Sequence, residues 1–151
     1  MVLETGSDAP EITARNQRGR HVTPDFETAA VVYFYPRDDT EGCTVEARQF
    51  EDHREIYEDA GVAVYGVSTD DADSHRDFAD DHDLGFDLLA DPDASVADAF
   101  DVPVADGAAA RTTFVIVAGR IVGVYEGVHP DGHARDVLRD LAELGLVEPA
   151  E

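Results

Sequence analysis

The chain has 151 residues and a hydrophobic fraction of 43%, which is enough for one ordinary core and predicts a single domain over residues 1–151. It carries 34 acidic and 11 basic residues, all of the latter arginine, so its formal net charge is −23. This balance disfavours nucleic acid and anionic membranes as partners, because phosphate binding relies on clusters of lysine and arginine. It indicates either a solvated acidic surface or, as we expect, adaptation to high intracellular salt, which screens repulsion between carboxylates.

The single cysteine, Cys43, cannot form an internal disulfide, which fits a reducing compartment. No run reaches the roughly 18 apolar residues that a membrane helix needs. The first six residues lack the basic and then apolar pattern of a secretory signal. We therefore expect a cytoplasmic protein with no membrane association.

Strands and helices alternate along the chain. The predicted strands share apolar, β-branched or alternating character and cover residues 13–23 (as a short hairpin), 31–35, 62–67, 86–90, 112–117 and 121–125. The predicted helices share apolar residues at helical spacing; they run from residue 43 to a stop at 60–61, from an N-cap within 68–70 to 82, around 96–100, and over 134–144. This order predicts an α/β fold with a central mixed β-sheet flanked by helices on both faces.

Cys43 lies between the strand at residues 31–35 and the helix that follows it. At a helix start a thiol meets backbone N–H groups that favour negative charge, and the thiolate is the reactive form of cysteine. Many free cysteines are inert, buried side chains. Because Cys43 follows Gly42 and a polar turn, we expect it outside the core and available for chemistry.

Thr40 and Pro36, which both precede Cys43, each have two alternative roles. Thr40 lies close enough to hydrogen-bond the sulfur or a substrate oxygen, and it is also a suitable helix N-cap. Pro36 either stiffens the turn after the strand or simply ends the strand.

The segment 36–46 resembles the active-site loop of peroxiredoxins and is most similar to their bacterioferritin-comigratory-protein, or PrxQ-type, branch. Pro36, Thr40 and Cys43 match the family's Pro-x-x-x-Thr-x-x-Cys spacing, and Arg111 matches its arginine before a late strand. The resemblance runs from about residue 6 to about residue 144. It implies a thioredoxin-like fold and an antioxidant thiol peroxidase that reduces hydrogen peroxide and organic hydroperoxides.

The residue types agree with this chemistry. Cys43 would be the nucleophile, and Arg111 would hold the sulfur ionised and hydrogen-bond a peroxide oxygen. Thr40 and the backbone N–H groups near Gly42 would complete the donor set, and the reaction would leave a sulfenic acid. The resemblance suggests that Glu46 orients arginine side chains around the site. The plain alternatives are an exposed glutamate for Glu46 and a surface salt bridge for Arg111.

One departure from the family matters. The position that carries a resolving cysteine in many relatives is Arg48 here, and there is no second cysteine. The oxidised Cys43 must therefore be reduced by an external thiol, from a thioredoxin-like protein or a small molecule. No metal or organic cofactor is expected, because Pro130 and Gly132 break the helical geometry of the closest histidine pair, His129 and His133, and the sequence has no phosphate-binding loop. The chain is expected to be a monomer or homodimer.

Other functions fit the sequence less well. A thioredoxin-like disulfide reductase would need Cys-x-x-Cys, and Glu46 occupies the second cysteine position. A Cys–His protease has no supporting local pattern. A non-enzymatic redox sensor or holdase would use the sulfenic acid of Cys43 as a switch and would not turn over.

Overall fold

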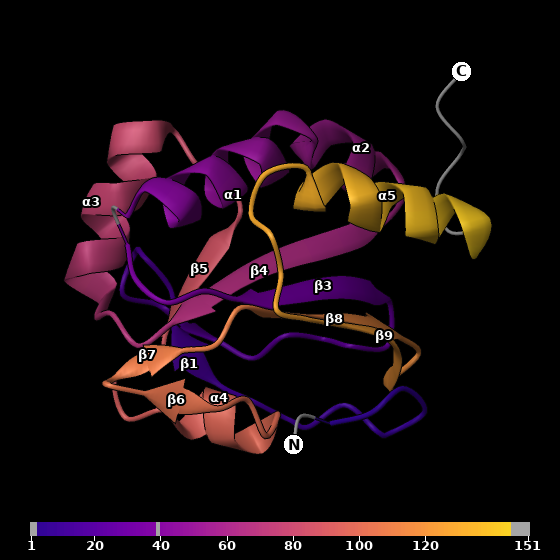
Figure 1. Cartoon of the computed structure of the whole chain (residues 1–151), viewed down its shortest axis with the longest axis horizontal. Helices are drawn as coiled ribbons and strands as arrows, with labels where there is room; N and C mark the ends of the chain where they lie inside the picture. Colours follow the sequence, from indigo (N-terminus) through magenta and orange to yellow (C-terminus); the bar gives the residue numbers. More distant parts are fainter. Residues whose placement is uncertain (1–2, 39, 146–151) are drawn as a thin grey trace.

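The computed structural model describes residues 3–38 and 40–145 (Figure 1). The strands are β1 (Ala14–Arg15), β2 (His21–Val22), β3 (Ala29–Phe34), β4 (Val62–Ser68), β5 (Asp87–Ala90), β6 (Val104–Ala105), β7 (Ala108–Ala109), β8 (Thr112–Val117) and β9 (Arg120–Glu126). The helices are α1 (Glu41–Asp52), α2 (Arg54–Asp59), α3 (Ala72–His82), α4 (Ser95–Ala99) and α5 (His133–Glu143). None of these helices is long and apolar enough to cross a bilayer.

Seven strands form one sheet in the order β2-β1-β5-β4-β3-β8-β9, and β6 pairs with β7 apart from it. Strands β3, β4 and β5 are parallel, whereas β8, β9 and the β1–β2 hairpin run antiparallel to their neighbours. The central mixed sheet and the two predicted hairpins are therefore confirmed.

The sheet separates two apolar cores. On β3, Val31 and Tyr33 face the core beneath α1, α2, α3 and α5, while Val32 and Phe34 face the core that α4 covers. Figure 1 shows α1, α2 and α5 on one side of the sheet and α4 on the other. Because side chains alternate along a strand, a strand buried on both faces must be apolar throughout, as β3 is.

Three local features differ from expectation. The helix predicted over residues 43–60 breaks at His53, which ends α1 and begins α2. The N-cap expected within residues 68–70 is Asp71, whose carboxylate accepts a hydrogen bond from the Ser74 N–H at 2.8 Å. Ser68 is unavailable as a cap because it still pairs with β5. Leu144, expected on the buried face of the last helix, is its exposed C-cap.

The β6–β7 pair was not predicted, although its turn has a sequence signal. Asp106 and Gly107 both have positive φ, as the central residues of a type I′ hairpin turn require. The dipeptide Asp-Gly favours this turn, but the flanking strands have only two residues each and carry little apolar pattern.

The sheet topology explains why Arg111 lies beside the segment that joins β3 to α1. The parallel strands β3 and β4 end at the same edge of the sheet. Strand β8 is antiparallel to β3, and its first residue, Thr112, pairs with Phe34 at the end of β3. Arg111, which precedes β8, is thereby brought next to the chain that leaves β3 for α1.

Candidate active site

Cys43 is the third residue of α1, and its side chain is buried, with 1% of its surface exposed. The expectation that it would lie outside the core was wrong. Cys43, Ala47 and Phe50 follow each other at spacings of four and three, so they share the face of α1 that packs on the sheet. The polar turn that precedes α1 does not expose this face of the helix to solvent.

The buried sulfur nevertheless meets a permanent cation. Arg111 donates from Nη2 to the Cys43 Sγ at 3.1 Å and from Nη1 to the Glu46 Oε1 at 2.9 Å. The Arg111 side chain is only 18% exposed, so its ion pair with Glu46 is not a surface salt bridge. A guanidinium at this distance stabilises a thiolate, and the low local dielectric strengthens the attraction.

Glu46 is 1% exposed, which excludes the exposed glutamate considered above. Burial raises its pKa from 4.5 to about 7, although the adjacent Arg111 acts in the opposite direction. Its Oε2 has no hydrogen-bond partner within the described parts of the chain. The carboxyl therefore holds Arg111 through Oε1 alone and, since its pKa is near neutrality, exists in both protonation states at pH 7.

Gly42 leaves the space that this arrangement needs. A Cβ at this position would lie 2.9 Å from the Arg111 Nη2 and 3.3 Å from the Pro130 Cγ. Any side chain here would push the guanidinium away from the sulfur. Gly42 therefore matters for the close approach of Arg111.

The Thr40 side chain makes no capping hydrogen bond to α1, and its contact with a substrate oxygen stays a prediction. Thr40 occupies the N-cap position of α1, and its carbonyl accepts from the Thr44 N–H at 2.9 Å, but its hydroxyl makes no cap bond. That hydroxyl instead donates to the Arg37 carbonyl at 3.2 Å. Pro36 follows the last backbone hydrogen bond of this strand region, in which the Tyr35 N–H donates to the Val67 carbonyl at 3.0 Å.

Tyr33 is a neighbour of the site that its sequence pattern did not predict. Its ring stacks on Phe50 of α1, with centroids 4.6 Å apart. Its hydroxyl is buried and, among the described residues, has no hydrogen-bond partner. Burial, followed by the charges of Glu46 and Cys43, raises the pKa of Tyr33 well above its usual value, so the phenol stays neutral.

Comparison with known proteins decides the family. Residues 5–124 match the AhpC/TSA family. The chain belongs to this family. Among curated AhpC/TSA-type relatives, Peroxiredoxin Bcp of Bacillus subtilis is 32% identical over 95% of this chain and 98% of its own length. Peroxiredoxin Q of rice chloroplasts (Oryza sativa subsp. japonica) is 38% identical over 94% of this chain and 68% of its own length.

Solved structures of the family show the same fold. The Xanthomonas campestris bacterioferritin comigratory protein, a structure concerned with alkyl peroxide reduction, superposes with a TM-score of 0.85. The two are 30% identical over 94% of this chain and 97% of that one. The AhpC/TSA protein described here is thus a peroxiredoxin of Bcp/PrxQ type with a thioredoxin-like fold, and it is a thiol peroxidase.

Glu46→Gln is expected to change how stability depends on pH. The folded protein binds more protons than the unfolded chain between about pH 4.5 and pH 7, because only the folded state raises the pKa of Glu46 to about 7. The stability that comes from protonated Glu46 is complete below this window and is lost as the pH rises through it. At 1.36 kcal/mol per pKa unit, the wild type should lose about 2–3 kcal/mol more than the variant between pH 5 and pH 8.

Urea denaturation of both proteins at the two pH values measures this difference. Glu41→Gln, which removes one negative charge from an exposed position of α1, is the control for charge alone. Parallel pH profiles of the wild type and Glu46→Gln would contradict the predicted role of the buried carboxyl.

Proposed function

We propose that this peroxiredoxin uses Cys43 as its only redox-active residue, with Arg111 as the group that activates the sulfur and Glu46 as the residue that orients Arg111. The observation that carries the proposal is the 3.1 Å contact from the Arg111 Nη2 to the Cys43 Sγ. The substrates are hydrogen peroxide and organic hydroperoxides. The alkyl peroxide reduction named for the Xanthomonas relative supports the second class.

In the first step the Cys43 thiolate attacks the terminal oxygen of the peroxide. An S–O bond forms, the O–O bond breaks, and the sulfur supplies two electrons. The leaving oxygen departs as hydroxide or alkoxide and takes up one proton, equal in number to the proton lost when the thiol ionised. Arg111 and the first N–H groups of α1 stabilise the negative charge that develops on oxygen.

The second step requires a thiol from outside the chain, because the sequence has one cysteine and Arg48 stands at the position of the family's resolving residue. The external thiol attacks the sulfenic acid and releases water, leaving a mixed disulfide on Cys43. A second external thiol then releases the Cys43 thiolate. A thioredoxin-like protein or a small thiol can perform both roles.

The direct test mixes the fully reduced protein with a small excess of peroxide and follows both thiol loss and turnover. We expect one thiol lost per chain, a sulfenic acid that dimedone traps at Cys43, and continued peroxide consumption once dithiothreitol or reduced thioredoxin is present. A Cys43 that reacts no faster than free cysteine would overturn the proposal. A single oxidation without turnover would instead indicate the redox sensor.

We also propose that the protein works in a salt-rich cytoplasm. This proposal rests on the net charge of −23 and the complete absence of lysine from the sequence. Raising NaCl from 0.1 M to 1 M shortens the Debye length from about 10 Å to about 3 Å, which screens repulsion between surface carboxylates. Thermal unfolding is therefore expected at a higher temperature in 1–2 M NaCl than in 0.1 M NaCl. An unchanged or lower melting temperature in high salt would refute it.

A further inference from the structure

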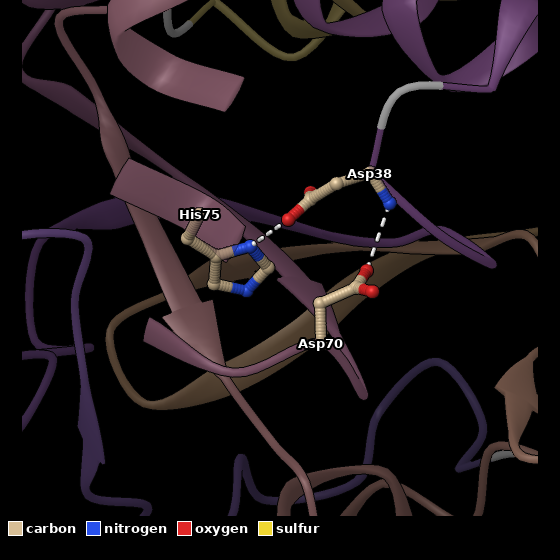
Figure 2. A group of neighbouring side chains, drawn as sticks. All are labelled: Asp38, Asp70 and His75. Atoms are coloured by element: carbon tan, nitrogen blue, oxygen red, sulfur yellow. Dashed lines mark hydrogen bonds and ion pairs between the residues drawn. The ribbon is translucent and has the colours of Figure 1, made fainter. Parts of the chain in front are cut away.

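The chain between β3 and α1 is anchored through one buried aspartate. The Asp38 carboxylate accepts hydrogen bonds from the Tyr35 hydroxyl at 2.7 Å on Oδ1 and from the Ser74 hydroxyl at 2.8 Å on Oδ2. The His75 Nδ1 also lies 2.7 Å from Oδ2 (Figure 2). Ser74 and His75 belong to α3, so this carboxylate joins the chain that leads into α1 to α3.

The partners of His75 define where its protons lie. The His75 Nε2 is 3.0 Å from the Leu89 carbonyl oxygen, which can only accept, so Nε2 carries a hydrogen. The 2.7 Å contact between Nδ1 and Oδ2 also requires a proton, because two lone pairs would repel each other at this distance. His75 and Asp38 therefore share a proton between side chains that are 0% and 2% exposed.

A second aspartate holds the backbone of the same segment. The Asp70 Oδ2 accepts from the Asp38 backbone N–H at 2.8 Å, as Figure 2 shows, and from the Ser68 hydroxyl at 2.7 Å. Asp38 is thus fixed through both its backbone and its side chain. Ser68 ends β4, so this second anchor is part of the sheet.

Asp38, Asp70 and His75 bring potential metal-ligand atoms within 4.8 Å of one another. All three of these atoms are already engaged in hydrogen bonds within the protein. The His75 Nδ1 and the Asp38 Oδ2 share a proton, and the Asp70 Oδ2 accepts hydrogen bonds from two donors. A cation would have to displace these hydrogen bonds in a buried site. The contacts therefore favour a mechanical anchor over a metal centre.

We propose that the buried Asp38–His75 pair is a clamp that positions the active-site loop, so that His75 is a positioning residue for the peroxidase reaction. The inference rests on the proposed function of Cys43. Asp38 lies two residues before Thr40, the N-cap of the helix that carries Cys43. A shift of about 1 Å at a reacting group can lower a rate by about 10²-fold, so a loosened loop start would disturb the Arg111–Cys43 contact.

Two amide variants of His75 separate its two hydrogen bonds. The side-chain nitrogen of asparagine superposes approximately on Nδ1 and that of glutamine on Nε2. His75→Asn therefore keeps a donor for Asp38, whereas His75→Gln keeps only the donor for the Leu89 carbonyl. Tyr35→Phe is a third variant, which removes one donor to Asp38 and retains the buried ring.

The measurements are the second-order rate of Cys43 oxidation by hydrogen peroxide and the rate of Cys43 alkylation by iodoacetamide. For His75→Gln we expect oxidation about 10- to 100-fold slower and alkylation faster, because the buried sulfur becomes accessible while its alignment is lost. His75→Asn should stay within about 3-fold of the wild type in both rates. Tyr35→Phe should change both rates in the same directions as His75→Gln, by a smaller factor.

Circular dichroism establishes that each variant is folded, and if His75→Gln is not, the comparison of Tyr35→Phe with the wild type decides. The clamp is refuted if the folded variants oxidise at the wild-type rate, or if His75→Asn loses as much activity as His75→Gln. A wild type that does not react with peroxide refutes the proposed function. A reactive wild type with unaffected variants refutes the clamp alone.

Discussion

Replacing Cys43 by serine is expected to reduce peroxide consumption by at least about a thousandfold while the protein remains folded. A serine hydroxyl is not ionised at neutral pH and does not attack the O–O bond. The oxygen is close in size to the sulfur, and it can accept the hydrogen bond that Arg111 donates to the Cys43 Sγ at 3.1 Å. The free energy of unfolding should therefore change by only about 1 kcal/mol, the typical effect of one altered hydrogen bond.

Peroxide consumption with a thiol reductant, measured beside urea denaturation, tests both parts of this prediction. Since the chain has one cysteine, Cys43→Ser also removes every thiol, and any remaining consumption measures the reductant's own reaction with peroxide. Turnover by Cys43→Ser above that background would mean that the peroxidase chemistry does not depend on Cys43. An unfolded variant would show that the sulfur is needed for packing.

Local sequence patterns predicted most of the fold because they report burial directly. The β-branched and aromatic apolar run that forms β3 favours a strand covered on both faces, and the spacing of Ala134, Val137 and Leu141 places one side of a helix against the sheet. The exact helix ends were less predictable. Asp71 caps α3 because Asp70 is already engaged by Ser68 and Asp38, and that competition involves a residue 32 positions away.

The site was predictable in part. Cys43 and Arg111 were found because their local motifs resemble those of a family, and the pairing of β3 with β8 then brings them together. The burial of Glu46 was not predictable, because a glutamate in the first turns of a helix is equally suited to solvent. Its position depends on a partner 65 residues further along the chain.

The Asp38–His75 pair gave even less signal. Asp38 is one of 34 acidic residues, and composition does not distinguish it from the others. His75 lies on the apolar face of its helix with Phe78, which indicates burial but names no partner. Only the folded chain brings together two residues that are 37 positions apart.

Arg111→Gln is expected to slow oxidation of Cys43 by about 10²- to 10³-fold, the usual cost of removing one donor that stabilises charge in a transition state. The variant loses the cation beside the sulfur and the fork that joins Cys43 to Glu46. Arg111→Lys retains the positive charge but not two donors in a fixed geometry, so its rate should fall between those of the wild type and Arg111→Gln. Stopped-flow measurement of thiol loss gives all three rates.

The same variant separates catalysis from stability, because Arg111→Gln leaves Glu46 buried without its cation. Arg111 is the group that lowers the pKa of Glu46 against the effect of burial, so removing it raises that pKa further and destabilises the protein above pH 7. The double variant Arg111→Gln/Glu46→Gln has no carboxyl at position 46 to protonate, and we expect it to regain stability at pH 8 without regaining the oxidation rate. Recovery of both quantities in the double variant would show that Arg111 acts only by neutralising Glu46. The two side chains are not energetically coupled if Glu46→Gln changes the stability at pH 8 equally in the wild type and in Arg111→Gln, a comparison that a double-mutant cycle makes directly.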